Sequence, residues 1–245
     1  MAKKNVKKQN NNKLYLFIIS LVTILILSGF LIMFEKNKEP EITDAIKIKE
    51  EYEALNDTYA FGSVKYNSII LDEENPFVYK TADEIVDILK NGTGIIYLGY
   101  PKCPWCRNAV NVLQHLNVDE IYYLDMTNER NSYSVKNGEL QKDNEGTKQY
   151  YEILKLLDEH LLDYEITDND KVYNVGEKRV YVPMVIGVLN GKVVGTHIDI
   201  VDLEEGQTAF DVLNKEQQEK LLDIYDEIRQ NVYGSSCDIE SKHGC

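Results

Sequence analysis

The chain has 245 residues, which suits one sizeable domain with appendages and is too short for two large domains with separate cores. Its formal net charge is -14, and because the first thirteen residues hold five lysines and no acid, the rest of the chain carries -19. Such an acidic body repels phosphate backbones, so nucleic acid is not an expected partner.

An uncharged apolar run, LYLFIISLVTILILSGFLIMF, occupies residues 14–34. As a helix it would extend about 31 Å, the thickness of a bilayer's hydrocarbon core. It continues into Glu35 and Lys36 without a small-residue cleavage site, which favours an uncleaved anchor over a signal peptide. The lysine-rich residues 1–13 precede it and predict a cytoplasmic tail. We therefore predict a single-pass protein of the cell membrane, with the N-terminus in the cytoplasm and the acidic body outside.

The next segment, residues 35–76, is charged and weakly patterned, and we interpret it as a juxtamembrane stalk and lead-in with an amphipathic helix over 43–56. A domain is predicted to follow over residues 77–233. It begins with a short strand at 77–79 and a helix that a capping box opens at Thr81. Two apolar strands at 95–98 and 121–124 flank a further helix, an order that places parallel strands side by side.

Residues 126–146 are polar and predict a loop, and residues 147–162 predict a helix with an apolar face, followed by an irregular polar stretch. Further on, Asn190-Gly191 separates two apolar runs, 184–189 and 192–201, which is a strong signal for a hairpin. The remaining expected elements are a terminal helix over 215–232 and a polar tail over 234–245.

The run GYPKCPWCR, residues 99–107, sits between the strand at 95–98 and the helix after it. A structural zinc site would need four ligands, and the remaining candidates, Cys237, Cys245 and His243, lie far along the chain without a matching spacing. We therefore expect no metal at the cysteine pair. A purely structural disulfide there would close too short a loop to restrict the unfolded chain appreciably.

Exchange of disulfides fits the setting better. A cysteine at the start of a helix has its thiolate stabilised by unpaired backbone amides and the helix dipole, and Cys103 occupies that position. We expect Cys103 to be exposed and to attack, and Cys106, one turn later, to resolve the mixed disulfide. Lys102 and Arg107 add positive charge nearby, and Trp105 is either a packing residue or an apolar contact for the partner.

Taken with Val182-Pro183 before an apolar strand, a hairpin and a terminal helix, this motif resembles the thioredoxin superfamily over residues 77–232. The resemblance implies an α/β thioredoxin-like fold, a central mixed sheet flanked by helices, here preceded by one transmembrane helix. It also implies that Pro183 is cis, that Val182 and Pro183 bind substrate, and that no cofactor is needed. The fragment YLGYPKCPWCRNAV is similar to membrane-linked bacterial proteins that include bacteriocin transport accessory proteins.

One departure concerns proton handling. Thioredoxin has a buried aspartate six residues before its first cysteine, where this chain has Tyr97. The direction of electron flow and the identity of the redox partner therefore stay open, although an oxidising exterior favours oxidation or isomerisation of exported proteins.

The other cysteines, Cys237 and Cys245, allow three arrangements: a local disulfide, a second redox pair that relays to Cys103, or thiols that cross-link to a neighbour. His115 and His197 have no companion placed for a metal or triad, and we interpret both as structural.

Two functions from different classes remain. The first is an anchored thiol-disulfide oxidoreductase acting on thiols or disulfides of exported proteins and peptides. The second is a binding or assembly module for exported peptides, with a passive disulfide, which the acidic surface and the long insertion over residues 126–170 would favour.

Overall fold

The computed structural model describes residues 14–28 and 42–234. Residues 14–28 are helical, and the remainder of the predicted anchor, 29–34, lies outside the described residues, as do the cytoplasmic tail and residues 235–245. No helix within the described ranges combines the length and the apolar character needed to cross a bilayer.

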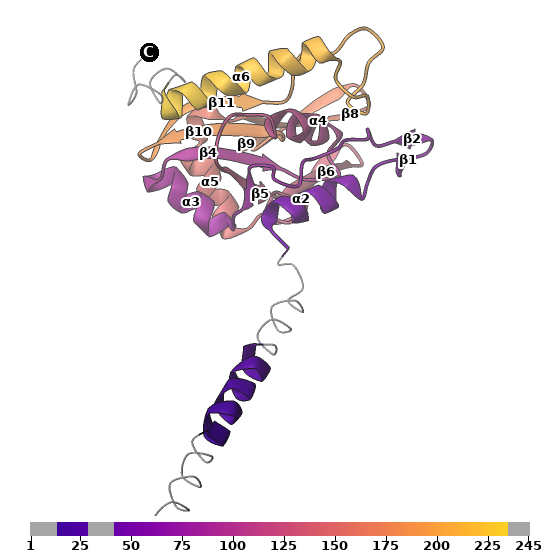
Figure 1. Ribbon diagram of the computed structural model, residues 1–245. Coiled ribbons are helices and arrows are strands. Elements are labelled where there is room, and N and C mark those ends of the chain that lie inside the picture. The colour runs from indigo at the N-terminus through magenta and orange to yellow at the C-terminus, as the bar shows by residue number, and fades with distance from the viewer. Residues whose placement is uncertain (1–13, 29–41, 235–245) are drawn as a thin grey trace, which may run out of the picture. The chain divides into compact units, whose positions relative to one another are not determined.

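A mixed five-stranded sheet forms the centre of the unit that starts at Thr43, and Figure 1 shows its strands and the surrounding helices. Its order is β11-β10-β4-β5-β3. Strands β3, β4 and β5 are parallel, whereas β10 runs antiparallel to β4 and β11 antiparallel to β10. The bounds are β3 Phe77–Tyr79, β4 Gly94–Gly99, β5 Ile121–Asp125, β10 Met184–Leu189 and β11 Lys192–Ile198. The predicted mixed sheet is confirmed, including the adjacent parallel pair β4 and β5.

Helices cover both faces of this sheet because the side chains of β4 are apolar on both faces. Ile95 and Tyr97 pack with α2, α4 and α6, whereas Ile96 and Leu98 pack with α3 and α5 on the other face. The bounds are α2 Asp44–Glu53, α3 Ala82–Asn91, α4 Pro104–Leu113, α5 Lys148–Leu156 and α6 Lys215–Tyr233. The α/β class with helices flanking the sheet is thereby established.

The lead-in over residues 43–71 is a layer of the domain. Helix α2 buries Ile48 and Tyr52, and the segment after the small hairpin of β1 Tyr59–Phe61 and β2 Val64–Lys65 buries Ile69 and Leu71. The compact unit consequently starts at Thr43, upstream of the predicted boundary at residue 77. Weak patterning conceals this layer because only a few apolar side chains reach the core.

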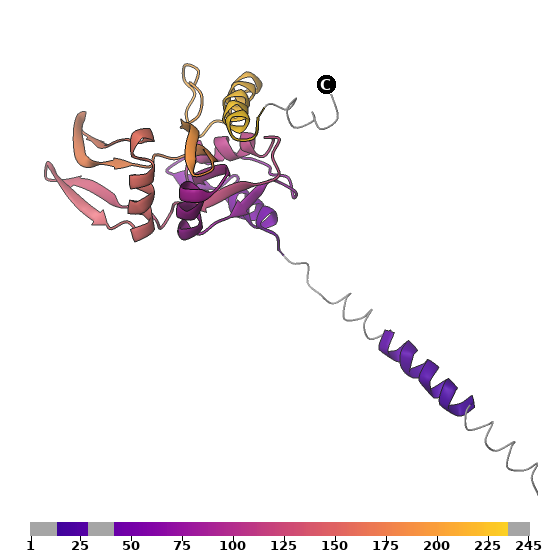
Figure 2. The same cartoon turned by 90° about the vertical axis from the view of Figure 1, so that its left-hand side faces the viewer.

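Residues 126–146 and the polar stretch after α5 contain strands, which corrects the predicted loop and irregular segment. Two hairpins form there, from β6 Ser132–Lys136 with β7 Glu139–Asn144 and from β8 Leu162–Asp168 with β9 Lys171–Arg179. Figure 2 shows them projecting on the opposite side of the domain from α6. Because they bury few apolar side chains, their sequences lack the alternation that signals a strand.

The predicted helix over 147–162 is shorter than expected. Thr147 caps α5, which ends at Leu156, and a 3-10 turn, Asp158–His160, precedes β8 at Leu162. The other local predictions are confirmed: Thr81 and Glu84 form the capping box, and Asn190 and Gly191 make the β10–β11 turn with φ of 50° and 72°. Both positive φ values are those of a hairpin turn.

Candidate functional site

The two cysteines lie where β4 leads into α4. Cys103 is the N-cap residue of α4, with φ -86° and ψ 115°, and Pro104 opens the helix. The Cys103 Sγ accepts a hydrogen bond from the Cys106 backbone N–H at 3.1 Å, in the manner of a capping side chain. An N–H of the first helical turn is therefore directed at this sulfur, which favours negative charge there.

Both cysteines of the pair are buried, which corrects the expectation that Cys103 is exposed. Cys103 is 4% exposed and Cys106 is 0% exposed. Burial, with a smaller contribution from the neighbouring Cys103, raises the pKa of Cys106 well above its usual value. Cys106 therefore stays protonated at neutral pH, and Cys103 is the sulfur nearer to solvent.

Val182 and Pro183 face the cysteine loop across the sheet. The Cys103 thiol donates to the Val182 carbonyl at 3.7 Å, and the Val182-Pro183 bond is cis, as expected. The topology explains this meeting of residues 79 positions apart, because β10 follows Pro183 and pairs with β4, with Met184 opposite Leu98. Trp105 is half-buried and packs against the core cluster below α4, so part of its surface is free beside Cys103.

Arg107 does not add charge at the cysteines, because its guanidinium is committed elsewhere. The residue is 0% exposed and donates to the Tyr52 carbonyl at 2.6 Å, the Asn56 Oδ1 at 2.6 Å and the Asn67 carbonyl at 2.8 Å. Burial lowers its pKa. Among the described residues, no carboxylate forms an ion pair with it.

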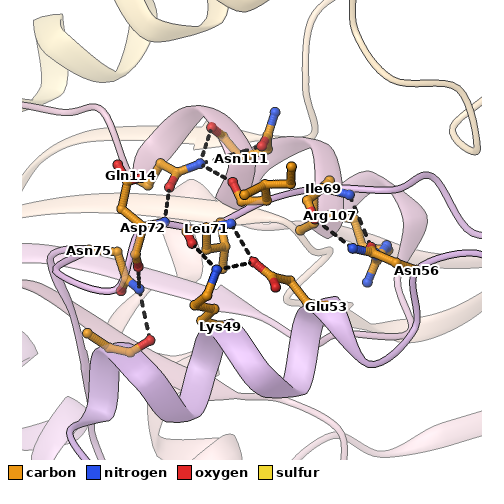
Figure 3. A network of polar contacts seen from close by, with 12 residues as sticks. Lys49, Glu53, Asn56, Ile69, Leu71, Asp72, Asn75, Arg107, Asn111 and Gln114 are labelled. Atoms are coloured by element: carbon orange, nitrogen blue, oxygen red, sulfur yellow. Dashed lines mark hydrogen bonds and ion pairs between the residues drawn. The ribbon is translucent and has the colours of Figure 1, made fainter.

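Figure 3 shows this arginine within a network that joins α4 to the lead-in. The Asn56 side chain accepts a hydrogen bond from Arg107 and exchanges two with the backbone of Ile69. Gln114, at the C-terminal end of α4, accepts from the Asp72 N–H and donates to the Ile70 carbonyl. Arg107 thus fastens the helix that carries the cysteines to residues 52–67. No sequence signal identified this role, because a single arginine beside the motif is equally consistent with solvated charge.

Tyr97 lies behind the cysteine pair. Its hydroxyl donates to the Cys106 carbonyl at 3.1 Å and lies 3.2 Å from the Tyr52 hydroxyl, which is then the donor in that pair. Gly99 is required here, since a Cβ at that position would lie 2.3 Å from the Tyr97 hydroxyl oxygen. Burial raises the pKa of Tyr97 well above its usual value. A neutral hydrogen-bonded tyrosine pair, Tyr52 and Tyr97, therefore supports Cys106 from beneath.

The histidines and the distal cysteines do not join this site within the described residues. His115 is exposed, and His197 on β11 packs its ring 5.9 Å from that of Tyr225, where burial lowers the pKa of His197. Cys237 and Cys245 lie outside the described residues, so their three arrangements stay predictions. Over 14–28 and 42–234, no three His, Cys, Asp or Glu side chains are grouped to hold a metal ion.

The arrangement can take up and release two electrons. Two thiols one helical turn apart can form a disulfide, and the more accessible sulfur can first bond to a partner's sulfur.

The chain matches no family model, no curated protein and no solved structure.

Proposed function

We propose that the protein is a membrane-anchored thiol-disulfide oxidoreductase with a thioredoxin-like domain, acting on exported proteins or peptides. The observation that carries the proposal is the difference between the two thiols. Cys103 caps α4 and receives an N–H hydrogen bond, whereas Cys106 is wholly buried and held protonated. The mixed α/β sheet flanked by helices and the position of Pro183 opposite the pair support the assignment to the thioredoxin superfamily.

In the proposed reaction, the Cys103 thiolate attacks one sulfur of a substrate disulfide. A mixed disulfide forms, and the other substrate sulfur leaves as a thiolate. Cys106 then attacks the Cys103 sulfur, the second substrate sulfur departs and takes up the proton that Cys106 loses, and the Cys103–Cys106 disulfide remains. The reverse sequence oxidises a substrate dithiol, and a location outside the cytoplasm favours that direction or isomerisation. A redox partner would restore the starting state.

A trapping experiment tests this function. The Cys106→Ser variant of the full chain is expected to accumulate mixed disulfides through Cys103, because the resolving thiol is absent. Both variants also carry Cys237→Ser and Cys245→Ser, so that the distal cysteines cannot form mixed disulfides. The matched Cys103→Ser variant should trap far less, since Cys106 is buried and protonated. Non-reducing gels before and after dithiothreitol give the measurement. A folded Cys106→Ser protein that forms no mixed disulfides in the presence of exported proteins would contradict the proposal.

The proposed location is the cell membrane, with residues 14–34 as the anchor and the domain outside. The uncharged run and the five lysines before it support this topology. Protease added to intact cells should remove an epitope at the C-terminus and spare one at the N-terminus. Protection of both epitopes would overturn the orientation.

The alternative is a binding module for exported peptides, and the two hairpins that project from the domain favour it because they add surface to which a peptide could bind. A variant with both Cys103→Ser and Cys106→Ser separates the two functions. Full cellular function of this variant would rule out the redox function and leave binding.

A further inference from the structure

A cavity of about 290 Å³ lies at the base of the two projecting hairpins and is lined by two arginines, Arg130 and Arg179. Its other lining residues are polar: Thr127, Asn128, Asn131, Ser132, Asn144 and Glu145. Two guanidinium groups in one small cavity are unexpected in a chain with a net charge of -14. The arrangement therefore needs an explanation other than the general surface composition.

The two arginines lie close together, and neither is paired with an acid among the described residues. Burial, with a further contribution from the positive charge of Arg130, lowers the pKa of Arg179. The Arg179 Nη1 donates to the Asn131 carbonyl at 3.2 Å, and its guanidinium lies 3.9 Å from the centre of the Tyr164 ring. Within residues 42–234, neither arginine forms an ion pair with a carboxylate. Most of their N–H donors are thus left for a ligand.

The carboxylates around the cavity are already engaged. Glu145 pairs with Lys142 at 3.1 Å and accepts from the Tyr151 hydroxyl. Glu177 of β9 accepts from the Asn131 Nδ2 at 2.8 Å and from the Tyr133 hydroxyl at 3.0 Å. Lys142 offsets the charge of Glu145, whereas Glu177 keeps its charge because its donors are neutral. Among the described residues, neither carboxylate lies within ion-pair distance of Arg130 or Arg179.

The cavity adjoins the cysteine pair through two chain connections. Strands β4 and β5 are parallel neighbours with Gly99 opposite Asp125, so the loop carrying Arg130 and the loop carrying Cys103 leave the same edge of the sheet. Tyr100 contacts both loops. The Arg130 guanidinium lies 5.0 Å from the centre of the Tyr100 ring, and the Tyr100 carbonyl accepts a hydrogen bond from the Cys103 N–H. From the other side, Arg179 precedes Val182 by three residues, a reach of about 10 Å.

One further atom indicates what kind of ligand fits. Asn131 is 0% exposed, and its Oδ1 has no hydrogen-bond partner among the described residues. A buried acceptor of this kind needs a donor. A peptide supplies both requirements, because an acidic side chain brings the carboxylate and the backbone brings N–H groups, whereas a fully deprotonated anion such as sulfate brings no donor.

We propose that Arg130 and Arg179 form a carboxylate-binding subsite that holds an acidic peptide segment of the substrate beside Cys103. Its role as a substrate subsite rests on the proposed function, while its binding of acidic peptide does not. The subsite would direct the cysteine pair toward acidic exported chains by attracting them to a local positive site within an acidic protein.

The test measures binding without thiol chemistry. The full chain in detergent carries Cys103→Ser and Cys106→Ser, and fluorescence anisotropy follows labelled peptides capped at both ends, one rich in aspartate and one with asparagine at the same positions. The aspartate peptide is expected to bind at least about tenfold more tightly, the range of one charge-assisted hydrogen bond, and the preference should shrink as salt is added. Because both reactive cysteines are absent, failure of the redox function leaves this result unaffected.

Matched variants assign the preference to the two arginines. Arg130→Gln with Arg179→Gln should abolish it, whereas Lys155→Gln with Lys171→Gln removes the same charge from exposed positions and should preserve it. If the double arginine variant does not fold, Arg130→Gln alone is used. Asn131 is held by Arg179 and Glu177, so this single substitution leaves its hydrogen bonds in place. A preference that persists without the arginines would overturn the proposal. So would binding of succinate, as a free dicarboxylate, without binding of the capped peptide.

Discussion

Two regions of the domain contain buried or half-buried arginines, and they use the same side chain differently. Behind the pair, Arg107 is 0% exposed and its guanidinium donates to acceptors of Tyr52, Asn56 and Asn67. Arg130 and Arg179 instead share a cavity, where Arg179 donates to the Asn131 carbonyl and Arg130 lies over the Tyr100 ring. The number of acceptors supplied by the chain distinguishes the two roles.

This contrast indicates how the role of a guanidinium follows from its surroundings. Where the neighbouring backbone supplies enough carbonyls, as it does around Arg107, the group joins separate segments and its charge is not available to a ligand. Where two such groups share a cavity and neither is paired with a carboxylate, as Arg130 and Arg179 do, an anion that binds between them can accept hydrogen bonds from both. Two measurements of stability test the distinction, and a third tests the burial of Cys106 between them in size of effect.

Removal of Arg107, the arginine whose donors are occupied by protein acceptors, should have the largest effect on stability. Arg107→Gln leaves several buried carbonyl acceptors without donors and detaches the lead-in from α4, which should lower the free energy of unfolding by about 3 kcal/mol or more. Urea unfolding of the full chain gives the value. Lys215→Gln, which breaks an ion pair whose lysine side chain is 90% exposed, is the control and should change stability by less than about 0.5 kcal/mol. If Arg107→Gln lowers the free energy of unfolding by less than about 1 kcal/mol, the network does not hold the lead-in to α4.

The buried thiol should make the stability of the reduced protein depend on pH. An unfolded cysteine releases its proton near pH 8.5, whereas the raised pKa of Cys106 keeps the folded thiol protonated. Above about pH 8.5 the folded state therefore binds more protons than the unfolded state, and stability falls as pH rises, by up to about 1.4 kcal/mol per unit.

Urea unfolding of reduced wild type and of Cys106→Ala, from about pH 7 to about pH 9.5, isolates this contribution because ionisation of the tyrosines in the unfolded chain affects both proteins alike. The wild type should lose stability over the upper part of this range relative to the variant. Parallel curves for the two proteins would mean that Cys106 ionises as readily in the folded protein as in the unfolded one.

Removal of Arg130, one of the two arginines in the cavity, should have the smallest effect on stability. Arg130→Gln takes away a contact with the Tyr100 ring and relieves the repulsion of Arg179, so these changes oppose each other. The free energy of unfolding should change by less than about 1 kcal/mol in either direction. A loss as large as that of Arg107→Gln would assign Arg130 to the scaffold and would weaken the case for a ligand in the cavity.

Two Asn-Gly turns illustrate how far local patterns reach. Asn190-Gly191 lies between strands that cross the core, so the apolar residues on either side of it predict the hairpin from the sequence alone. Asn137-Gly138 makes the same kind of turn, with φ of 54° and 82°, yet its strands β6 and β7 project from the core and are largely polar. Both turns carry the same residue pair, and only burial of the flanking strands makes one of them predictable.

Local sequence was sufficient to predict the mixed α/β class, the strand before the cysteines, the helix that Cys103 caps and the hairpin after Pro183. These features follow from apolar periodicity, capping and turn residues, which act over a few positions. Tertiary structure was needed to establish that Cys103 is covered by the Val182 region and that Tyr97 and Tyr52 support Cys106. It was also needed to separate Arg107, which serves the lead-in, from Arg130 and Arg179, which meet in one cavity. Those outcomes depend on which distant carbonyls and side chains fold against each charge, and that is set by sheet topology and burial, which no local pattern encodes.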